Sequence, residues 1–263
     1  MEIIDAHAHI YPTKIAEKAT VAIGKFYDIE MEMPAGTAEQ LLEDGSRAGI
    51  TRYVVHSVAT TAHQVRSINE FIKKEIDEHK EFIGFMTLHQ DLTEEEIAKE
   101  VDWCIENGFK GVKLHPDFQK FYIDGEDAEK FYRVIGDRLP ILFHTGDDRY
   151  EYSKPKRLVK MAKKYLNVRF IAAHFGGYRC WQDVGFYVGL DNVYFDTCSS
   201  LAFIPTETAR DIIDLLGAEK FFFATDFPMW DAKKELERFY AIPMTDEERE
   251  MILSKNIKKL LKI

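Results

Sequence analysis

The chain has 263 residues, 46% of them hydrophobic, which is enough for one large domain with a sizeable core. Its formal net charge of −10 argues against nucleic acid as a partner, because phosphate binding needs a basic surface. The three cysteines are widely spaced, which argues against a disulfide framework or a CxxC metal site. No apolar run approaches the length of a membrane span and no apolar signal core opens the chain, so we expect a soluble, cytoplasmic protein without a membrane partner.

Short apolar segments alternate with longer amphipathic ones along the whole chain. Their valine, isoleucine and phenylalanine content and their length are typical of buried parallel strands. We expect eight such strands: EIID near residue 2, then segments beginning at residues 50, 81, 108, 139, 168, 192 and 220.

The amphipathic segments carry helix signals. Thr37 is an expected N-cap with Gly49 as the stop, and Thr93 is an expected N-cap with Gly108 as the stop. The remaining helices are expected within 64–82, 127–138, 155–166, 206–217 and 245–263, with a further one at 14–26 inside a long first loop. The basic ending KNIKKLLKI has amphipathic spacing and predicts a docked final helix with a solvated lysine face; a membrane-surface helix is the lesser alternative.

Eight strands alternating with about eight helices predict an α/β fold, a (β/α)₈ TIM barrel. We expect a single domain over 1–263, in which 11–37 forms a lid insertion. A doubly wound open sheet is the competing fold, but its first strand is usually followed by a glycine-rich phosphate loop, and here that strand ends in HAHIYP.

Unusual polar residues cluster at the carboxyl ends of the expected strands, where barrel enzymes carry their catalytic groups. His7 and His9 alternate along one strand and therefore point the same way. Each residue alone has an ordinary structural explanation, but several buried imidazoles and a carboxylate are costly unless they are paired or bind a metal. The sequence thus predicts a site for Zn²⁺ first, with Mn²⁺, Fe²⁺ or Co²⁺ as options. Its members are His7, His9, Lys113, His115, His144, His174 and Asp226.

Six motifs in order, HAHI, KLHP, HTG, AHFGG, NVYFDTCSS and ATDFP, resemble the amidohydrolase superfamily. The resemblance covers essentially the whole chain. It is strongest to the amidohydrolase-related branch that includes aminocarboxymuconate-semialdehyde decarboxylase. It implies a metal-dependent enzyme on a TIM barrel of the metal-dependent hydrolase type.

The resemblance also implies roles for particular residues. His174 would act as an acid or base in a one-metal enzyme, or bind a second ion in a two-metal enzyme. Lys113 would bridge two ions if it were carboxylated; we lean towards one essential ion and an unmodified Lys113. The metal ligands implied by the motifs are His7, His9, His144 and Asp226.

The primary functional expectation is hydrolysis of a C–N or C–O bond, as in an amide, lactone or cyclic imide, by a metal-activated water with Asp226 as the base. The alternative is non-oxidative decarboxylation of a small aromatic or unsaturated acid. A second alternative is a non-catalytic metal-binding barrel. The partner is a small molecule, and the oligomeric state is open, with a homodimer as one option. The expected substrate-binding residues are Lys113, His115, Arg149 and Arg179.

Overall fold

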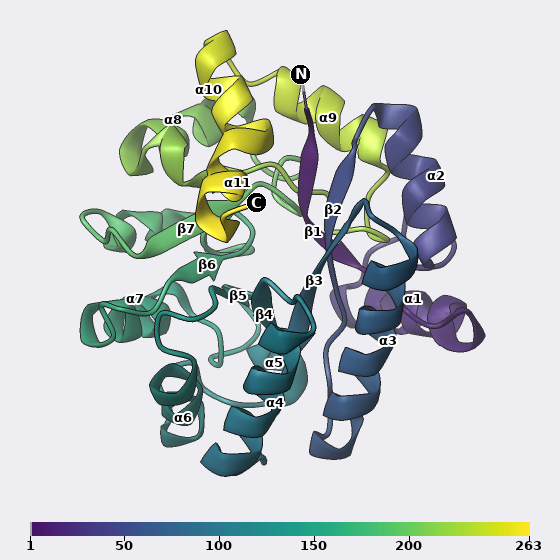
Figure 1. Cartoon of the computed structure of the whole chain (residues 1–263). Coiled ribbons are helices and arrows are strands. Elements are labelled where there is room, and N and C mark those ends of the chain that lie inside the picture. Colours follow the sequence, from purple (N-terminus) through teal and green to yellow (C-terminus); the bar gives the residue numbers. More distant parts are fainter. Residues whose placement is uncertain (1) are drawn as a thin grey trace.

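The computed structural model describes residues 2–263. Eight parallel strands, in the order of the chain, form a nearly closed (β/α)₈ barrel (Figure 1). The last strand returns to the first, because the Ala6 amide donates to the Phe223 carbonyl at 2.9 Å and Ala8 pairs with Phe227. The strands are β1 (Ile4–His9), β2 (Arg52–His56), β3 (Phe82–Thr87), β4 (Gly111–Leu114), β5 (Ile141–Phe143), β6 (Phe170–Ala172), β7 (Val193–Asp196) and β8 (Phe221–Phe222).

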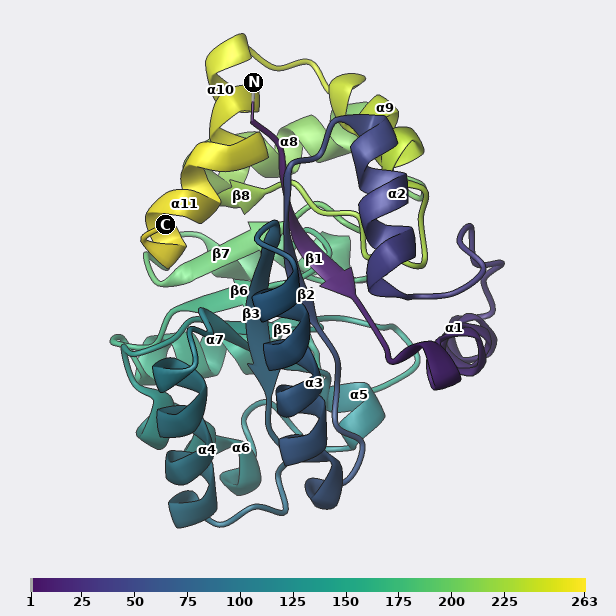
Figure 2. The same cartoon turned by 45° about the vertical axis from the view of Figure 1, so that its right-hand side comes forward.

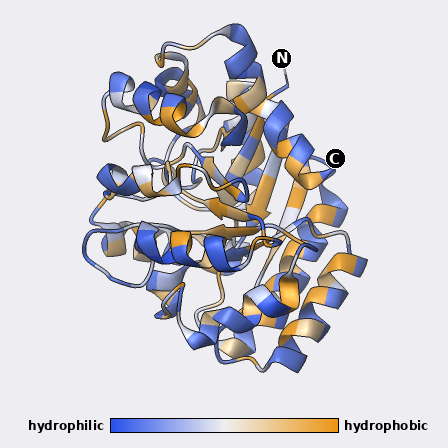
Figure 3. Ribbon diagram, turned by 90° about the vertical axis from the view of Figure 1, so that its left-hand side faces the viewer, coloured by the Kyte–Doolittle hydropathy of each residue, from blue (hydrophilic) through white to orange (hydrophobic). Residues whose placement is uncertain are grey.

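Helices surround the barrel, and their apolar faces turn towards the strands while their polar faces point outward (Figure 3). The α-helices are α1 (Thr13–Tyr27), α2 (Ala38–Ala48), α3 (Val65–Glu78), α4 (Glu94–Glu106), α5 (Pro116–Gln119), α6 (Glu126–Ile135), α7 (Pro155–Lys164), α8 (Thr206–Leu216), α9 (Ala232–Tyr240), α10 (Asp246–Glu250) and α11 (Asn256–Leu261). Three 3₁₀ turns, η1 (Ala62–Gln64), η2 (Trp181–Tyr187) and η3 (Ala218–Lys220), and a π-helical segment, η4 (Met251–Lys255), complete the set.

The predicted elements are confirmed at all eight strands. The caps are confirmed too: the Thr37 side chain accepts from the Gln40 amide, and α2 ends at Gly49 with a φ of 80°. The helix expected at 14–26 spans 13–27. Two helices were not predicted, α5, which is one turn long, and α9, which begins after the N-cap Asp231. None of the helices within residues 2–263 has the length and apolar character needed to cross a membrane.

The two ends of the barrel are filled differently. Apolar side chains from β1, β2, β3 and β5 fill the amino-terminal end, and α11 covers it with Ile257, Leu260 and Leu261, as expected of a docked final helix. The carboxyl ends of the strands lead instead to polar side chains. There, the chain leaving β1 runs directly into α1 (Figure 2). The carboxyl end of the barrel is therefore the end at which a polar site can form.

Candidate metal centre and active site

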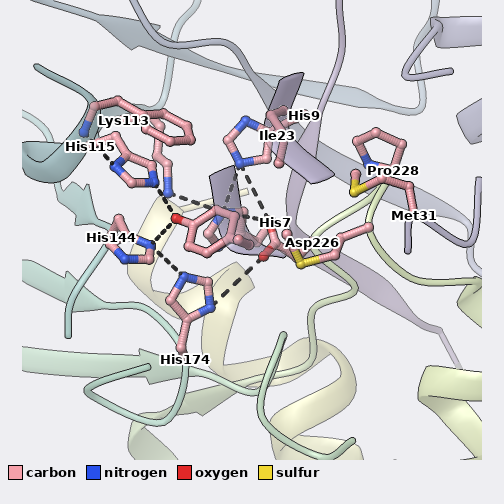
Figure 4. A pocket seen from close by; sticks show the side chains of 13 residues that line it. His7, His9, Ile23, Met31, Lys113, His115, His144, His174, Asp226 and Pro228 are labelled. Atoms are coloured by element: carbon pink, nitrogen blue, oxygen red, sulfur yellow. Dashed lines mark hydrogen bonds and ion pairs between the residues drawn. The ribbon is translucent and has the colours of Figure 1, made fainter. Parts of the chain in front are cut away.

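The carboxyl ends of the strands bring the predicted site residues into one cavity (Figure 4). His7 and His9 lie on β1 and Lys113 on β4, and the other members follow directly or within a few residues of their strands. All are almost fully buried. The predicted residues that line the cavity are His7, His9, Lys113, His115, His144, His174 and Asp226.

Three donor atoms converge at the centre of this cavity. The Nε2 atoms of His7 and His9 lie 3.3 Å apart, and each lies 3.4 Å from Oδ1 of Asp226. Two donors about 2.1 Å from one ion at a tetrahedral angle are about 3.4 Å apart. The spacing and the nitrogen and oxygen chemistry of the three donors therefore fit a divalent ion, and a set of three leaves coordination positions for a ligand.

His7 is oriented by a residue that the sequence analysis did not assign to the site. Nδ1 of His7 lies 2.8 Å from Oδ2 of Asp196, at the end of β7, so that Nε2 points into the cavity. The other carboxylate oxygen of Asp196 accepts from the His174 amide at 2.7 Å. Carboxylate–histidine pairs of this kind fix the tautomer and orientation of metal-binding histidines. The sequence does contain a signal for Asp196. It is an acidic residue at the end of an expected strand, and the ends of other strands in the barrel already carried predicted site residues.

Asp226 and His174 both occupy strained backbone positions, with φ values of 60° and 63°. Non-glycine residues rarely adopt this left-handed conformation, and such strain often accompanies functional sites. Hydrogen bonds hold both residues in place: the Asp226 amide donates to the His7 carbonyl at 2.9 Å, and the His174 amide donates to Asp196. The backbone thereby aims both side chains into the cavity.

The charge state of Asp226 suits a metal ligand. Burial alone would raise the pKa of this carboxyl, but electrostatic attraction to His7 and hydrogen bonding with His9 hold the pKa well below its usual value. The hydroxyl of Ser199 also donates to the second carboxylate oxygen. Asp226 is therefore an anion at neutral pH.

Among the residues 2–263 that line the cavity, Lys113 is the only lysine or arginine, and its side chain is fully buried. Its Nζ lies 3.0 Å from Nε2 of His7. Burial lowers the pKa of Lys113 to about 8, and the nearby carboxylates of Asp226 and Asp196 oppose this effect. At neutral pH the side chain remains mostly an ammonium beside the metal donors.

A second group of rings lies across the cavity from these donors. Nε2 of His174 lies 2.9 Å from Nδ1 of His144, and the His144 ring stacks on His115 with centroids 4.0 Å apart. Burial lowers the pKa of all three histidines, so they are neutral at pH 7. The hydroxyl of Tyr27 lies 2.8 Å from Nε2 of His115. Tyr27 comes from α1 and was not predicted as a site residue.

Segment 11–37 supplies part of the cavity wall. Ile23, Tyr27 and Met31 line the cavity from this side, and the space between the lining groups is about 20 Å³. That volume is enough for about one water molecule. Substrate therefore needs movement of the lining groups, or entry from a neighbouring cavity.

The structure does not bring Arg149 and Arg179 into this cavity. The Arg149 guanidinium binds the Asp147 carboxylate at 2.7 Å and the Phe26 carbonyl, at the end of α1, at 2.6 Å. Nε of Arg179 donates to the hydroxyl of Tyr178 at 3.1 Å. Arg149 thus holds the carboxyl end of α1 in place.

Comparison with known proteins gives a family for this architecture. The family model described as Amidohydrolase matches residues 4–263, whereas no curated protein is detectably similar to the chain. Solved structures are similar in fold. An uncharacterised TIM-barrel protein from Bordetella bronchiseptica is 17% identical, with a TM-score of 0.82 over 100% of this chain and 99% of the other.

Two structures named as decarboxylases also share the fold. A 5-carboxyvanillate decarboxylase from Sphingomonas paucimobilis is 12% identical, with a TM-score of 0.78 over 100% of this chain and 99% of the other. A dihydroxybenzoic acid decarboxylase from a Polaromonas species, with bound manganese, is 15% identical, with a TM-score of 0.76 over 99% and 97%. Because the family match spans nearly the whole chain and the donor set fits a divalent ion, the protein belongs to the amidohydrolase family and is a metal-dependent enzyme.

Proposed function

We propose that this enzyme catalyses the non-oxidative decarboxylation of a small aromatic or unsaturated carboxylic acid. The observation that carries the proposal is the buried ammonium of Lys113, 3.0 Å from His7, beside an open set of three metal donors. A substrate carboxylate would neutralise this cation, which would otherwise lie beside a dication without a counter-charge of its own. The names of the two decarboxylases with the same fold support the same chemistry.

His7, His9 and Asp226 would hold the ion, which when bound polarises substrate oxygens as a Lewis acid. Either Mn²⁺ or Zn²⁺ suits this mixed nitrogen and oxygen donor set. Lys113 would pair with the substrate carboxylate and orient it.

His174 is the proposed proton donor. When the C–C bond to the carboxylate breaks, its electron pair stays on the ring or alkene carbon, and CO₂ leaves. The His174 ring is neutral at rest, so Nε2 first takes up a proton, for which the 2.9 Å contact with His144 offers a route, and the carbon then takes this proton from the imidazolium. The net change is RCOO⁻ + H⁺ → RH + CO₂.

The enclosure of the cavity supports this reaction. Ile23, Met31, Phe118 and Met229 surround the polar centre, and the free space holds about one water. Loss of CO₂ disperses the carboxylate charge, so a site that replaces bulk water with ordered protein groups favours the step.

Hydrolysis, the primary expectation from the sequence, remains the second candidate. Asp226 is held as an anion beside the donors, where it can act as a base. The His144–His174 pair, 2.9 Å apart, is also spaced to bind a second ion. A two-metal hydrolase would need a carboxylated Lys113, and the side chains near its Nζ would have to move to admit the added atoms.

The test is product analysis with metal-loaded enzyme. CO₂ release from a panel of hydroxybenzoates is measured beside turnover of lactones, cyclic imides and p-nitrophenyl esters, each with and without a chelator. Chelator-sensitive CO₂ release that is lost in Lys113→Met supports decarboxylation. Metal-dependent turnover confined to the lactones, imides or esters would replace the proposal with hydrolysis.

A further inference from the structure

A second and larger cavity adjoins the metal centre. It has a volume of about 540 Å³ and lies between α1 and α3, which neighbour each other at the carboxyl end of the barrel (Figures 1 and 2). Ligand pockets for small molecules typically measure about 300–1,000 Å³. The size of this cavity therefore suits a small molecule or part of one.

The walls of this cavity are apolar stripes on two helices. Ile15, Ala19 and Ile23 recur every four residues along α1, and Ile68 and Phe71 face them from α3. A surface helix normally buries such a stripe. Here the stripe is incompletely covered, and half of the surface of Ile15 is exposed. The two helices thus hold an apolar space open.

The two cavities are neighbours. His9, Ile23 and Phe118 line both of them, so the larger space lies directly beside a metal donor. A molecule bound through its acidic end at the metal centre would reach this space with its other end. The metal centre alone, with about 20 Å³ of free volume, does not hold a whole aromatic acid.

The larger cavity offers little to a charged group. Within the described residues, its lining includes no aspartate, glutamate, lysine or arginine. Two of its polar members are already engaged: the Ser57 hydroxyl donates to the Ile10 carbonyl, and the Gln64 side chain accepts from the Thr60 and Thr61 amides. Recognition in this space therefore rests mainly on apolar contact and shape.

We infer that the substrate is a carboxylic acid extended by an uncharged, apolar group, an aryl ring or a short hydrocarbon, which occupies the cavity between α1 and α3. This inference rests on the proposed decarboxylation for the position of the acidic end. It adds a specificity pocket and a substrate class: an aryl- or alkyl-substituted acid rather than a compact single-ring acid.

The experiment measures binding and turnover separately. Calorimetry with manganese-loaded enzyme compares salicylate with its 3-, 4- and 5-phenyl derivatives. At least one phenyl derivative should bind about tenfold more tightly or better, because burying a ring removes much apolar surface from water. Ala19→Phe, which fills the cavity from α1, should abolish this gain and leave salicylate affinity within about twofold.

Matched variants keep the result interpretable. Val21→Phe adds an aromatic side chain to an exposed position of α1 outside the cavity, and it should preserve the gain. Ile68→Gln places a polar group in the cavity from α3 and should also reduce the gain. It serves as the cavity variant if Ala19→Phe does not fold. Equal affinities for all four acids, or a gain that survives in both cavity variants, would overturn the pocket. A gain in affinity that persists without CO₂ release would support the pocket and refute decarboxylation. A dimer that forms only in the absence of ligand would show that the apolar faces of α1 and α3 bind a second copy of the chain.

Discussion

Asp196→Asn tests whether the metal centre depends on the orientation of His7. Both carboxylate oxygens of Asp196 accept hydrogen bonds, one from Nδ1 of His7 at 2.8 Å and the other from the His174 amide at 2.7 Å. An asparagine has only one acceptor oxygen, so either amide orientation turns an NH₂ group towards one of these donors. The substitution also removes the negative charge that favours the neutral tautomer with Nε2 free for the metal.

Loss of such a supporting carboxylate typically weakens metal binding by about 10- to 100-fold. This corresponds to about 1.4–2.8 kcal/mol, since each tenfold change is about 1.4 kcal/mol. The assay is competition for Mn²⁺ or Zn²⁺ against a chromophoric chelator, with circular dichroism to verify the fold. Asp191→Asn, at an exposed position just before β7, is the matched control and should bind as the native protein does. If Asp196→Asn folds and its affinity stays within about twofold of the native value, Asp196 does not support the metal as argued.

Four further outcomes are expected. The double variant His7→Ala and His9→Ala should contain no metal by elemental analysis, since it loses two of three donors, and metal retained at the native level would disprove this site. Asp226→Asn should keep its melting temperature within a few degrees but lose activity by orders of magnitude, because the neutral amide cannot replace the anionic metal ligand, and an unchanged kcat would make Asp226 purely structural. Asn256→Ala should destabilise the fold by about 1–3 kcal/mol in urea unfolding, because its side-chain amide donates to the buried Ala218 and Phe221 carbonyls at 2.8 and 2.9 Å. Gly111→Ala should cost a similar ~1–3 kcal/mol, since an added Cβ would lie 2.4 Å from the Phe85 ring; no loss would mean that β4 shifts freely.

The barrel was predictable because its signals are local. Strand segments are short apolar runs, and helix ends such as Thr37 and Thr93 depend on a side chain that bonds to an amide three residues away. α5 and α9 were missed for different reasons. α5 is a single turn after His115, too short to show a helical period. α9 carries a local signal of the same kind as the predicted helices, since the Asp231 side chain accepts from the Lys234 amide three residues away, and it could have been predicted from that cap.

The site was predictable where chemistry lies at a strand end. His7 and His9 share a face because strand side chains alternate, and the barrel places all strand ends around one mouth. Arg149 and Arg179 follow strands as well, yet the structure turns them to Asp147, to the end of α1 and to Tyr178. Long, flexible side chains on loops find partners that sequence spacing does not reveal.

By itself, then, the sequence determined the order of strands and helices. It also determined which histidines, lysine and aspartate lie at the strand ends. Both follow from hydrophobic periodicity and strand alternation, which are properties of neighbouring residues. Only the tertiary structure decided that Asp196 supports His7 from across the barrel and that Tyr27 of α1 reaches His115. It also decided that α1 and α3 leave an apolar cavity beside His9. The physical reason is that these contacts join residues distant in the chain, and their geometry follows from how the helices and loops pack on the closed sheet.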